Sequence, residues 1–288
     1  AVGDGVADDT DAVQAAFDHG PVYFPPGTFL ITSDITFTRT SPCRGAGAQV
    51  SVVQATGSPQ YFRLTGGNNA LWTHTIEGIG FDGVGLVFGA TDTDHAQGTN
   101  LLDLEIQNVV GNGVYYAFNT WMTSITRCYI HDNSVGVYFD FTTAVDSLGA
   151  SMVIRDGGIF ANGIGVHCVG YTPGGGHLIL HAVDLEQNTT TAIRTETMGF
   201  DASSPTGILI DLTDCHLELQ TAGYWLEMDG GTMRIRGMWA YPYGFAGSPA
   251  FVKLEGGARL SLVDSYITVN AGKLVHFAGT EGGTLAID

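Results

Sequence analysis

A recurring series of aromatic, cationic and acidic residues in this sequence has the side-chain types needed for chemistry on a sugar chain. Aromatic planes can stack on pyranose rings, and a guanidinium with an imidazole can bind the carboxylate of an acidic sugar. Two carboxyl groups can act as acid and base on a glycosidic bond. The predicted binding residues are Tyr115, Tyr138, His167, Arg194 and Trp225. The predicted catalytic residues are Glu196, Glu227 and Asp140.

These residues belong to an internal repeat that predicts how they are positioned. Four segments, 128–133, 157–162, 183–188 and 215–220, each end in an amide residue. The amides are Asn133, Asn162, Asn188 and Gln220, at intervals of 29, 26 and 32 residues. Each is followed by a small residue and a β-rich run, and each repeat begins with another β-rich run. Three short strands per repeat predict a β-solenoid, in which the asparagines of successive coils stack and exchange hydrogen bonds.

The repeat also predicts which side chains of the strand after each amide face outward. Alternation along the strand places Val114, Val137, Val166, Ile193 and Tyr224 inward and the candidate binding residues outward. Coils lie about 4.8 Å apart, so Glu196 and Glu227 are expected about 5 Å apart, within the range of retaining glycosidases. The carboxyl groups of Asp140 and Glu196, which are two coils apart, are expected to be separated by a larger distance. The alternative interpretation is a solvated strand face whose charges prevent aggregation.

The N-terminal segment carries a family resemblance. Residues 3–16 read GDGVADDTDAVQAA and residues 22–31 read VYFPPGTFLI. Both resemble the opening of the pectate-lyase-like right-handed β-helix superfamily. The resemblance implies an all-β, right-handed parallel β-helix, for which we expect about nine to ten coils. We expect one domain over 1–288, with a capping helix within 1–20, irregular first coils over 21–70 and regular coils over 71–288. The aspartates of the opening segment are expected to cap the helix.

Within that superfamily, the opening is familiar from phage tailspikes, tail-associated polysaccharide depolymerases and some secreted bacterial epimerases and lyases. It therefore implies a tailspike-type homotrimer of the virion tail or the extracellular space that binds a bacterial surface polysaccharide and degrades it as a glycoside hydrolase. Two alternatives remain open. A lyase or epimerase acting on a uronate glycan would use His167 or Tyr138 as base, with Arg194 neutralising the uronate. A receptor-binding or structural tail protein would have no activity.

Other features of the sequence exclude some substrates and partners. The signature motifs of polygalacturonases and of calcium pectate lyases are absent, so pectin is not the expected substrate. A net charge of −18, from 29 acidic and 11 basic residues, argues against a nucleic-acid partner or an anionic membrane surface. No apolar run is long enough for membrane insertion. The outward-facing candidate residues are expected to line a groove for the sugar chain. The loop 141–150, with Asp146, is expected to form one wall of this groove beside Asp140.

Cysteine and histidine spacing predicts neither disulfide nor metal. The four cysteines form no CxxC pair and are expected to be small buried side chains. The histidines outside the candidate site show no ligand spacing and are interpreted as surface or turn residues: His131, His177, His181 and His216. We therefore expect no metal and no cofactor.

Overall fold

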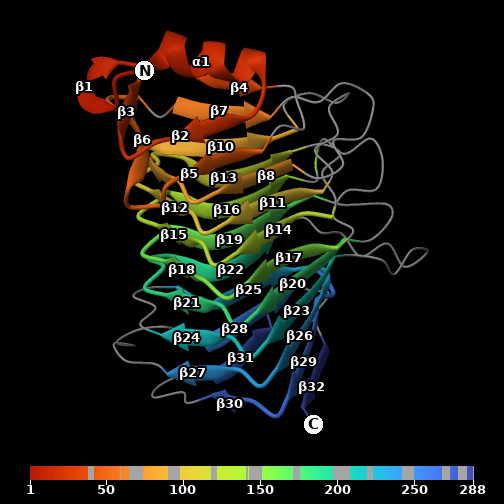
Figure 1. Ribbon diagram of the computed structural model, residues 1–288. Helices are drawn as coiled ribbons and strands as arrows, with labels where there is room; N and C mark the ends of the chain where they lie inside the picture. The colour runs from red at the N-terminus through yellow and green to blue at the C-terminus, as the bar shows by residue number, and fades with distance from the viewer. Residues whose placement is uncertain are drawn as a thin grey trace.

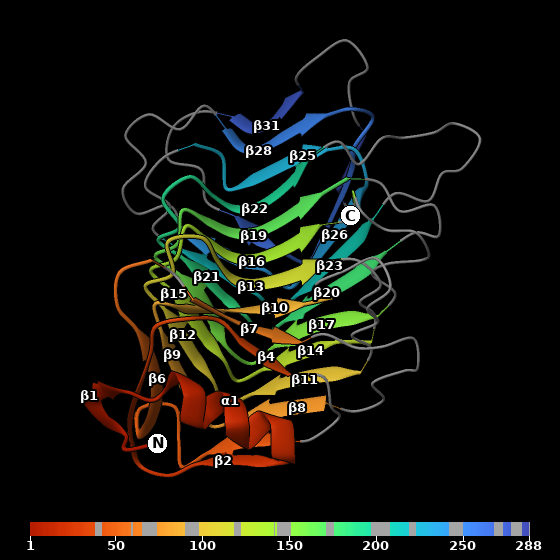
Figure 2. The same ribbon diagram turned by 90° about the horizontal axis from the view of Figure 1, so that it is seen from above.

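The chain winds into a right-handed parallel β-helix built from three long sheets (Figures 1 and 2). The computed structural model describes residues 1–37, 42–58, 60–64, 74–89, 98–117, 122–140, 142, 151–170, 176–196, 208–218, 223–241, 250–267, 273–277 and 284–287. Among these residues the sheets contain eleven, ten and eleven strands, which confirms the predicted fold. Right-handed winding is the usual hand of connections between parallel strands of one sheet.

Each sheet takes one strand from each coil, and we call them sheets A, B and C. Sheet A contains, in order, β1 (Asp4–Asp8), β3 (Gly27–Ile31), β6 (Ser51–Ala55), β9 (Gly80–Asp82), β12 (Glu105–Gln107), β15 (Tyr129–His131), β18 (Gly158–Phe160), β21 (Asp184–Glu186), β24 (His216–Glu218), β27 (Trp239–Tyr241) and β30 (Tyr266–Ile267). Sheet B contains β2 (Val22–Phe24), β5 (Cys43–Gly45), β8 (His74–Glu77), β11 (Thr99–Leu102), β14 (Ser124–Thr126), β17 (Met152–Arg155), β20 (His177–His181), β23 (Leu209–Thr213), β26 (Thr232–Arg236), β29 (Arg259–Val263) and β32 (Thr284–Ile287). Sheet C contains β4 (Ile35–Phe37), β7 (Gln60–Leu64), β10 (Val84–Phe88), β13 (Asn112–Ala117), β16 (Val135–Asp140), β19 (Ile164–Val169), β22 (Thr191–Glu196), β25 (Leu226–Asp229), β28 (Ala250–Glu255) and β31 (Lys273–Phe277).

Two kinds of tight bend turn the chain within a coil. Between sheets B and A, single residues such as Asp156, Asp214 and Asp264 have positive φ angles of 56°, 53° and 44°. Short polar side chains such as aspartate tolerate this left-handed conformation better than most. Gly230 and Gly231, also with positive φ, connect sheet C directly to sheet B.

An asparagine ladder forms the bend between sheets A and C and confirms the predicted alignment of coils. Asn133 Nδ2 donates to Asn162 Oδ1 at 3.0 Å, and Asn162 Nδ2 donates to Asn188 Oδ1 at 3.1 Å. All three side chains are buried. They also donate to carbonyls of the preceding coil, such as that of Ile130. The ladder therefore satisfies buried backbone groups that a bend would otherwise leave unpaired. Gln220, the fourth predicted amide, lies outside the described residues.

A short helix covers the N-terminal end of the stack (Figure 1). Helix α1 (Thr10–His19) buries Val13 and Phe17, and the Phe17 ring lies 5.0 Å from that of Phe37 and 5.6 Å from that of Phe62. It thus shields the edge that an open solenoid would leave exposed. The expected capping by aspartates is only partly correct. Asp8 accepts from the Thr10 amide, whereas the carboxylate of the N-cap residue Asp9 accepts from Val2 and Gly3.

The interior is a continuous apolar core in which buried residues extend from Val13 to Leu262. All four cysteines are free and buried within it, as predicted, and burial raises the pKa of the Cys215 thiol to about 11. No helix among the described residues is long and apolar enough to span a membrane.

Candidate functional site

Most of the predicted binding residues form one row across the outer face of sheet C. Tyr115 lies opposite Tyr138, Tyr138 opposite His167, and His167 opposite Arg194. The rings of Tyr115 and Tyr138 are 5.3 Å apart, and those of Tyr138 and His167 are 5.1 Å apart. We call this series, continued below, the first row. Its direction crosses the strands and follows the axis of the solenoid (Figure 2).

The prediction that Trp225 faces outward in this row is wrong. Arg194 lies opposite Glu227, so the first row continues through Glu227, and the register differs from the predicted one by two residues. Trp225 is 1 % exposed, and its ring lies 5.4 Å from that of Phe251 in the next coil. Tyr224 was expected inward, but it is partly exposed and its hydroxyl lies 2.6 Å from His276 Nδ1.

The physical reason for the shift is the burial of the indole at the start of β25. The carbonyl of Trp225 accepts from the amides of both Ala192 and Ile193, which places Trp225 beside Ala192. In the previous coil the corresponding position is Gly165, between the paired residues 164 and 166. A large ring packed on Phe251 at this position removes far more apolar surface from water than a glycine there would. That register directs Glu227 toward Arg194.

The first row leads into a depression of about 330 Å³ on the outer face of β22, β25 and β28. Its lining consists of Arg194, Thr195, Glu196, Glu227, Asp229, Lys253 and Glu255. Arg194 Nη2 lies 2.5 Å from Glu227 Oε2, and Arg194 Nη1 lies 3.4 Å from Glu196 Oε1. The predicted pair Glu196 and Glu227 therefore meets at one guanidinium. The two glutamates do not occupy matched strand positions. Glu227 belongs to the first row, whereas Glu196 lies two residues beyond Arg194 along β22 and so belongs to the neighbouring row of the same outer face.

Asp140 lies in the same row as Glu196, two coils away across Val169. Its Oδ2 accepts from the Tyr115 hydroxyl at 2.8 Å, and its Oδ1 accepts from the amide and hydroxyl of Thr142 at 2.9 and 2.5 Å. Burial, and then the hydrogen bond to Asp140, raise the pKa of the Tyr115 hydroxyl. Tyr115 is thereby fixed as a neutral aromatic donor. Of the loop 141–150 that was predicted to wall the groove, only Thr142 lies within the described residues, so Asp146 lies outside them.

His167 is the one buried titratable side chain of the first row with an unpartnered polar atom among the described residues. Its Nε2 has no hydrogen-bond partner, although Glu196 Oε1 lies 3.4 Å away. Burial lowers the pKa of His167, and the nearby charge of Glu196 opposes this only in part. The imidazole is therefore neutral at neutral pH.

Three charged residues of the depression were missed in the sequence analysis. Asp229, Lys253 and Glu255 are brought to Arg194 by the pairing of β22, β25 and β28. The alternating pattern of 226–229 and 250–255, LEMD and AFVKLE, contained the signal. This signal was missed because the sequence alignment placed Trp225 instead of Glu227 opposite Arg194, two residues out of register.

A second, smaller depression of about 260 Å³ lies on the outer face of sheet B. Asp211 is central to it, with Arg234 Nε at 2.6 Å and His177 Nε2 at 2.7 Å. Although burial acts in the opposite direction, hydrogen bonds from Arg234 and His177 lower the pKa of Asp211. This carboxylate is held ionised between two donors.

The coil repeat, the three parallel sheets and the N-terminal helix together define a pectate-lyase-like right-handed β-helix protein. The chain belongs to the family described as rhamnogalacturonase A/epimerase, pectate lyase-like, whose model matches residues 1–152. No curated protein matches the sequence.

Solved structures share this fold at low sequence identity. ORF18 of Geobacillus virus E2 is similar with a TM-score of 0.70 and 17 % identity, over 99 % of this chain and 59 % of that one. The N-terminal fragment of gene product 12 of bacteriophage phi29 has a TM-score of 0.61 and 16 % identity, over 99 % and 60 %. The A-module of the mannuronan C-5 epimerase AlgE4 of Azotobacter vinelandii has a TM-score of 0.56 and 15 % identity, over 99 % and 98 %. The chain thus spans about three fifths of the length of ORF18 and of the gene product 12 fragment.

Proposed function

We propose that this protein binds a polysaccharide along the outer face of sheet C and cleaves it as a glycoside hydrolase. The observation that carries the proposal is the continuity between the first row and the depression. Tyr115, Tyr138 and His167 follow one another along the solenoid axis and lead to the carboxylates around Arg194. An extended sugar chain lying along this axis would contact aromatic rings first and acidic groups next. The likeness of the fold to an epimerase that acts on mannuronan supports a polysaccharide ligand.

In this proposal Glu196 and Glu227 are the acid and base, and Asp140 is the reserve partner of Glu196. Both glutamates contact the Arg194 guanidinium from different rows. Arg194 is then a positioning residue for the two carboxylates, and it can also bind an acidic group of the substrate. Trp225 has no role in binding, because it is buried in the core.

Glutamine substitution tests this assignment. Glu196→Gln and Glu227→Gln should each lower turnover at least about a hundredfold, the lower end for acid–base groups, while glycan binding is retained. The substrate is found by incubating the protein with bacterial capsule and cell-wall polysaccharides and analysing the products by mass spectrometry. Glu105→Gln, a change on the outer face of sheet A, is the matched control. Cleavage at the normal rate by both glutamine variants would contradict the assignment, and attention would move to Asp140.

His167 favours a second candidate, a lyase or epimerase acting on a uronate glycan. A neutral imidazole beside Tyr138 could take the proton next to a uronate carboxylate that Arg194 neutralises. A lyase would release an unsaturated product that absorbs ultraviolet light, and an epimerase would change the sugar composition without cleaving the chain. His167→Gln should abolish either outcome, whereas a hydrolase gives saturated products. Binding without any product would indicate a receptor-binding or structural protein.

We also propose that the protein acts as a tailspike-type homotrimer of a virion tail. The similarity of the fold to two phage proteins supports this location. Exposed aromatic side chains away from β21 and β24, such as that of Tyr23 on sheet B, support burial of one flank on assembly. Light scattering at micromolar concentration should give three times the mass of the chain, and a stable monomer would refute the trimer.

A further inference from the structure

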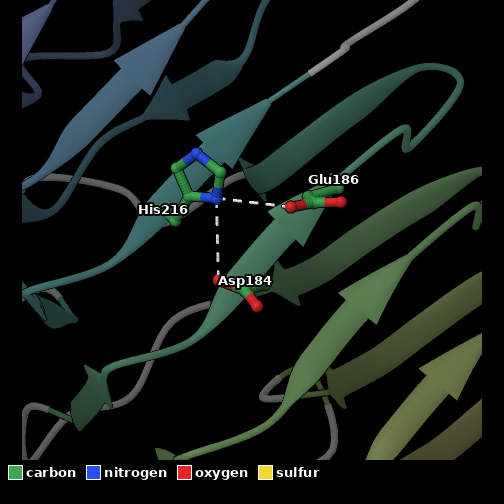
Figure 3. A group of neighbouring side chains, drawn as sticks. All are labelled: Asp184, Glu186 and His216. Carbon is green, nitrogen blue, oxygen red and sulfur yellow. Dashed lines mark ion pairs between the residues drawn. The ribbon is translucent and has the colours of Figure 1, made fainter.

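A group of acidic and imidazole side chains on sheet A has no part in the proposed groove on sheet C. Strands β21 and β24 pair in parallel, with Asp184 opposite His216 and Glu186 opposite Glu218. All four therefore project from the same outer face. Figure 3 shows the His216 ring directed toward the carboxylates of Asp184 and Glu186, which come from the neighbouring coil. The sequence analysis missed this group, since the residues lie about 30 positions apart, although the aligned repeats place DLE of 184–186 directly over HLE of 216–218.

We infer that Asp184, Glu186 and His216 form a binding site for a divalent metal ion of the zinc class. His216 Nδ1 lies 3.3 Å from Glu186 Oε1 and 3.7 Å from Asp184 Oδ1, and the three ligand atoms lie within 4.8 Å of one another. Zinc bonds of about 2.0 to 2.2 Å in tetrahedral geometry separate neighbouring ligand atoms by about 3.3 to 3.6 Å. A small adjustment of the exposed Asp184 side chain completes three such ligand positions.

The other nitrogen of the imidazole strengthens this inference. His216 Nε2 lies 3.5 Å from Glu218 Oε2. In protein metal sites the ring nitrogen that does not bind the metal commonly carries its proton toward a carboxylate, which fixes the ring and its tautomer. With the proton on Nε2, the Nδ1 lone pair points at two carboxylates. In that tautomer a metal ion between the three electron donors would offset their mutual repulsion.

The ligand set also selects the kind of cation. One imidazole with carboxylates suits zinc, nickel or copper, whereas calcium and magnesium prefer oxygen ligands alone. Asp184 is exposed, while Glu186 and His216 are partly buried, so an ion can enter from solvent and keep water in its fourth position. The ion would join the coils of β21 and β24 by their side chains, in addition to the hydrogen bonds of the sheet.

A protonated imidazole that pairs with the same carboxylates is the alternative, and metal titration of the full chain separates the two. Isothermal titration with zinc chloride should show one zinc ion bound per chain. His216→Ala should abolish binding, and Glu218→Gln should weaken it by about 10- to 100-fold, the usual effect of removing a carboxylate that orients a ligand. His181→Ala is the matched control, because His181 faces the single carboxylate of Asp214 at 3.8 Å on sheet B, and it should bind zinc like the wild type.

Trp239 provides an independent readout, since its ring centroid lies 5.3 Å from that of His216. Binding of copper should quench its fluorescence, and Trp239→Phe should lose this quenching while still binding zinc. Circular dichroism of each variant establishes that it is folded. If the wild type binds no stoichiometric zinc, or if His216→Ala binds it as the wild type does, the group is an ion-pair network and the proposed metal site is overturned.

Discussion

Arg194 and Glu227 lie opposite each other on neighbouring coils, with Arg194 Nη2 2.5 Å from Glu227 Oε2, although 33 residues separate them in the sequence. The pair is well shielded, since the two side chains are 25 % and 17 % exposed. It is surrounded by further carboxylates, those of Glu196, Asp229 and Glu255. Glu227 also lies opposite Lys253 of the next coil, so the guanidinium and this ammonium group together offset the negative charge of these carboxylates.

Arg194→Gln should destabilise the protein by about 1.5 to 3 kcal/mol, because it removes a hydrogen bond to a charged, largely buried partner. The midpoint of urea denaturation, compared with that of the wild type, measures this change. Arg127→Gln is the matched control. The Arg127 pair with Asp103 also joins neighbouring coils, but its side chains are 55 % and 43 % exposed, so solvent screens the pair and its loss should shift the midpoint much less. Equal effects of the two substitutions would show that shielding of the pair does not matter.

Asn162→Ala should be among the most destabilising polar substitutions in the chain. The Asn162 amide group bonds to the side chains of Asn133 and Asn188 and to the Ile130 carbonyl, all buried. Each buried group left unpaired costs about 1 to 3 kcal/mol, so the total loss should exceed 2 kcal/mol. Asn100→Ala serves as control, since Asn100 is only partly buried and bonds to the Ser124 hydroxyl. Thermal unfolding followed by circular dichroism compares the two, and similar midpoints would argue against the ladder as a stabilising element.

Trp225→Ala should destabilise the protein by about 3 to 5 kcal/mol, as expected for removal of a large buried aromatic ring. Trp225→Phe retains packing against Phe251 and should cost much less. If glycan binding occurs on sheet C, the folded Phe variant should bind as the wild type does, because residue 225 does not reach the surface. Weakened binding by a Trp225→Phe protein of normal stability would place this position in the groove after all.

His167 should make stability depend on pH in a defined direction. Because burial lowers the pKa of His167 in the folded state, the unfolded chain takes up a proton below about pH 6.5 while the folded protein does not. Stability is therefore lost as the pH falls through that value and approaches the lower, folded pKa. His167→Gln should remove this contribution, so the variant should gain stability relative to the wild type between pH 7.5 and pH 5.5. Denaturant midpoints at several pH values measure the difference, and a difference independent of pH would contradict the lowered pKa.

The sequence alone was sufficient for the coil and for features repeated in every coil. The αL bends at Asp156 and Asp214, the ladder of Asn133, Asn162 and Asn188, and the helix ending before Gly20 all follow from local patterns. Backbone conformation and side-chain alternation depend on residues close together in the chain, so the same short pattern produces the same structure in each repeat. The outward row from Tyr115 to Arg194 was predictable for this reason.

What only the tertiary structure decided is how one coil aligns with the next where the repeat becomes irregular. Burial of Trp225 against Phe251 moved the register by two residues and placed Glu227, rather than Trp225, opposite Arg194. In the same way, the meeting of His216 with Asp184 depends on the pairing of β21 with β24 and not on spacing in the sequence. Register between coils is selected by the burial of large side chains over the whole interface, a property of the packed solenoid that no single repeat contains.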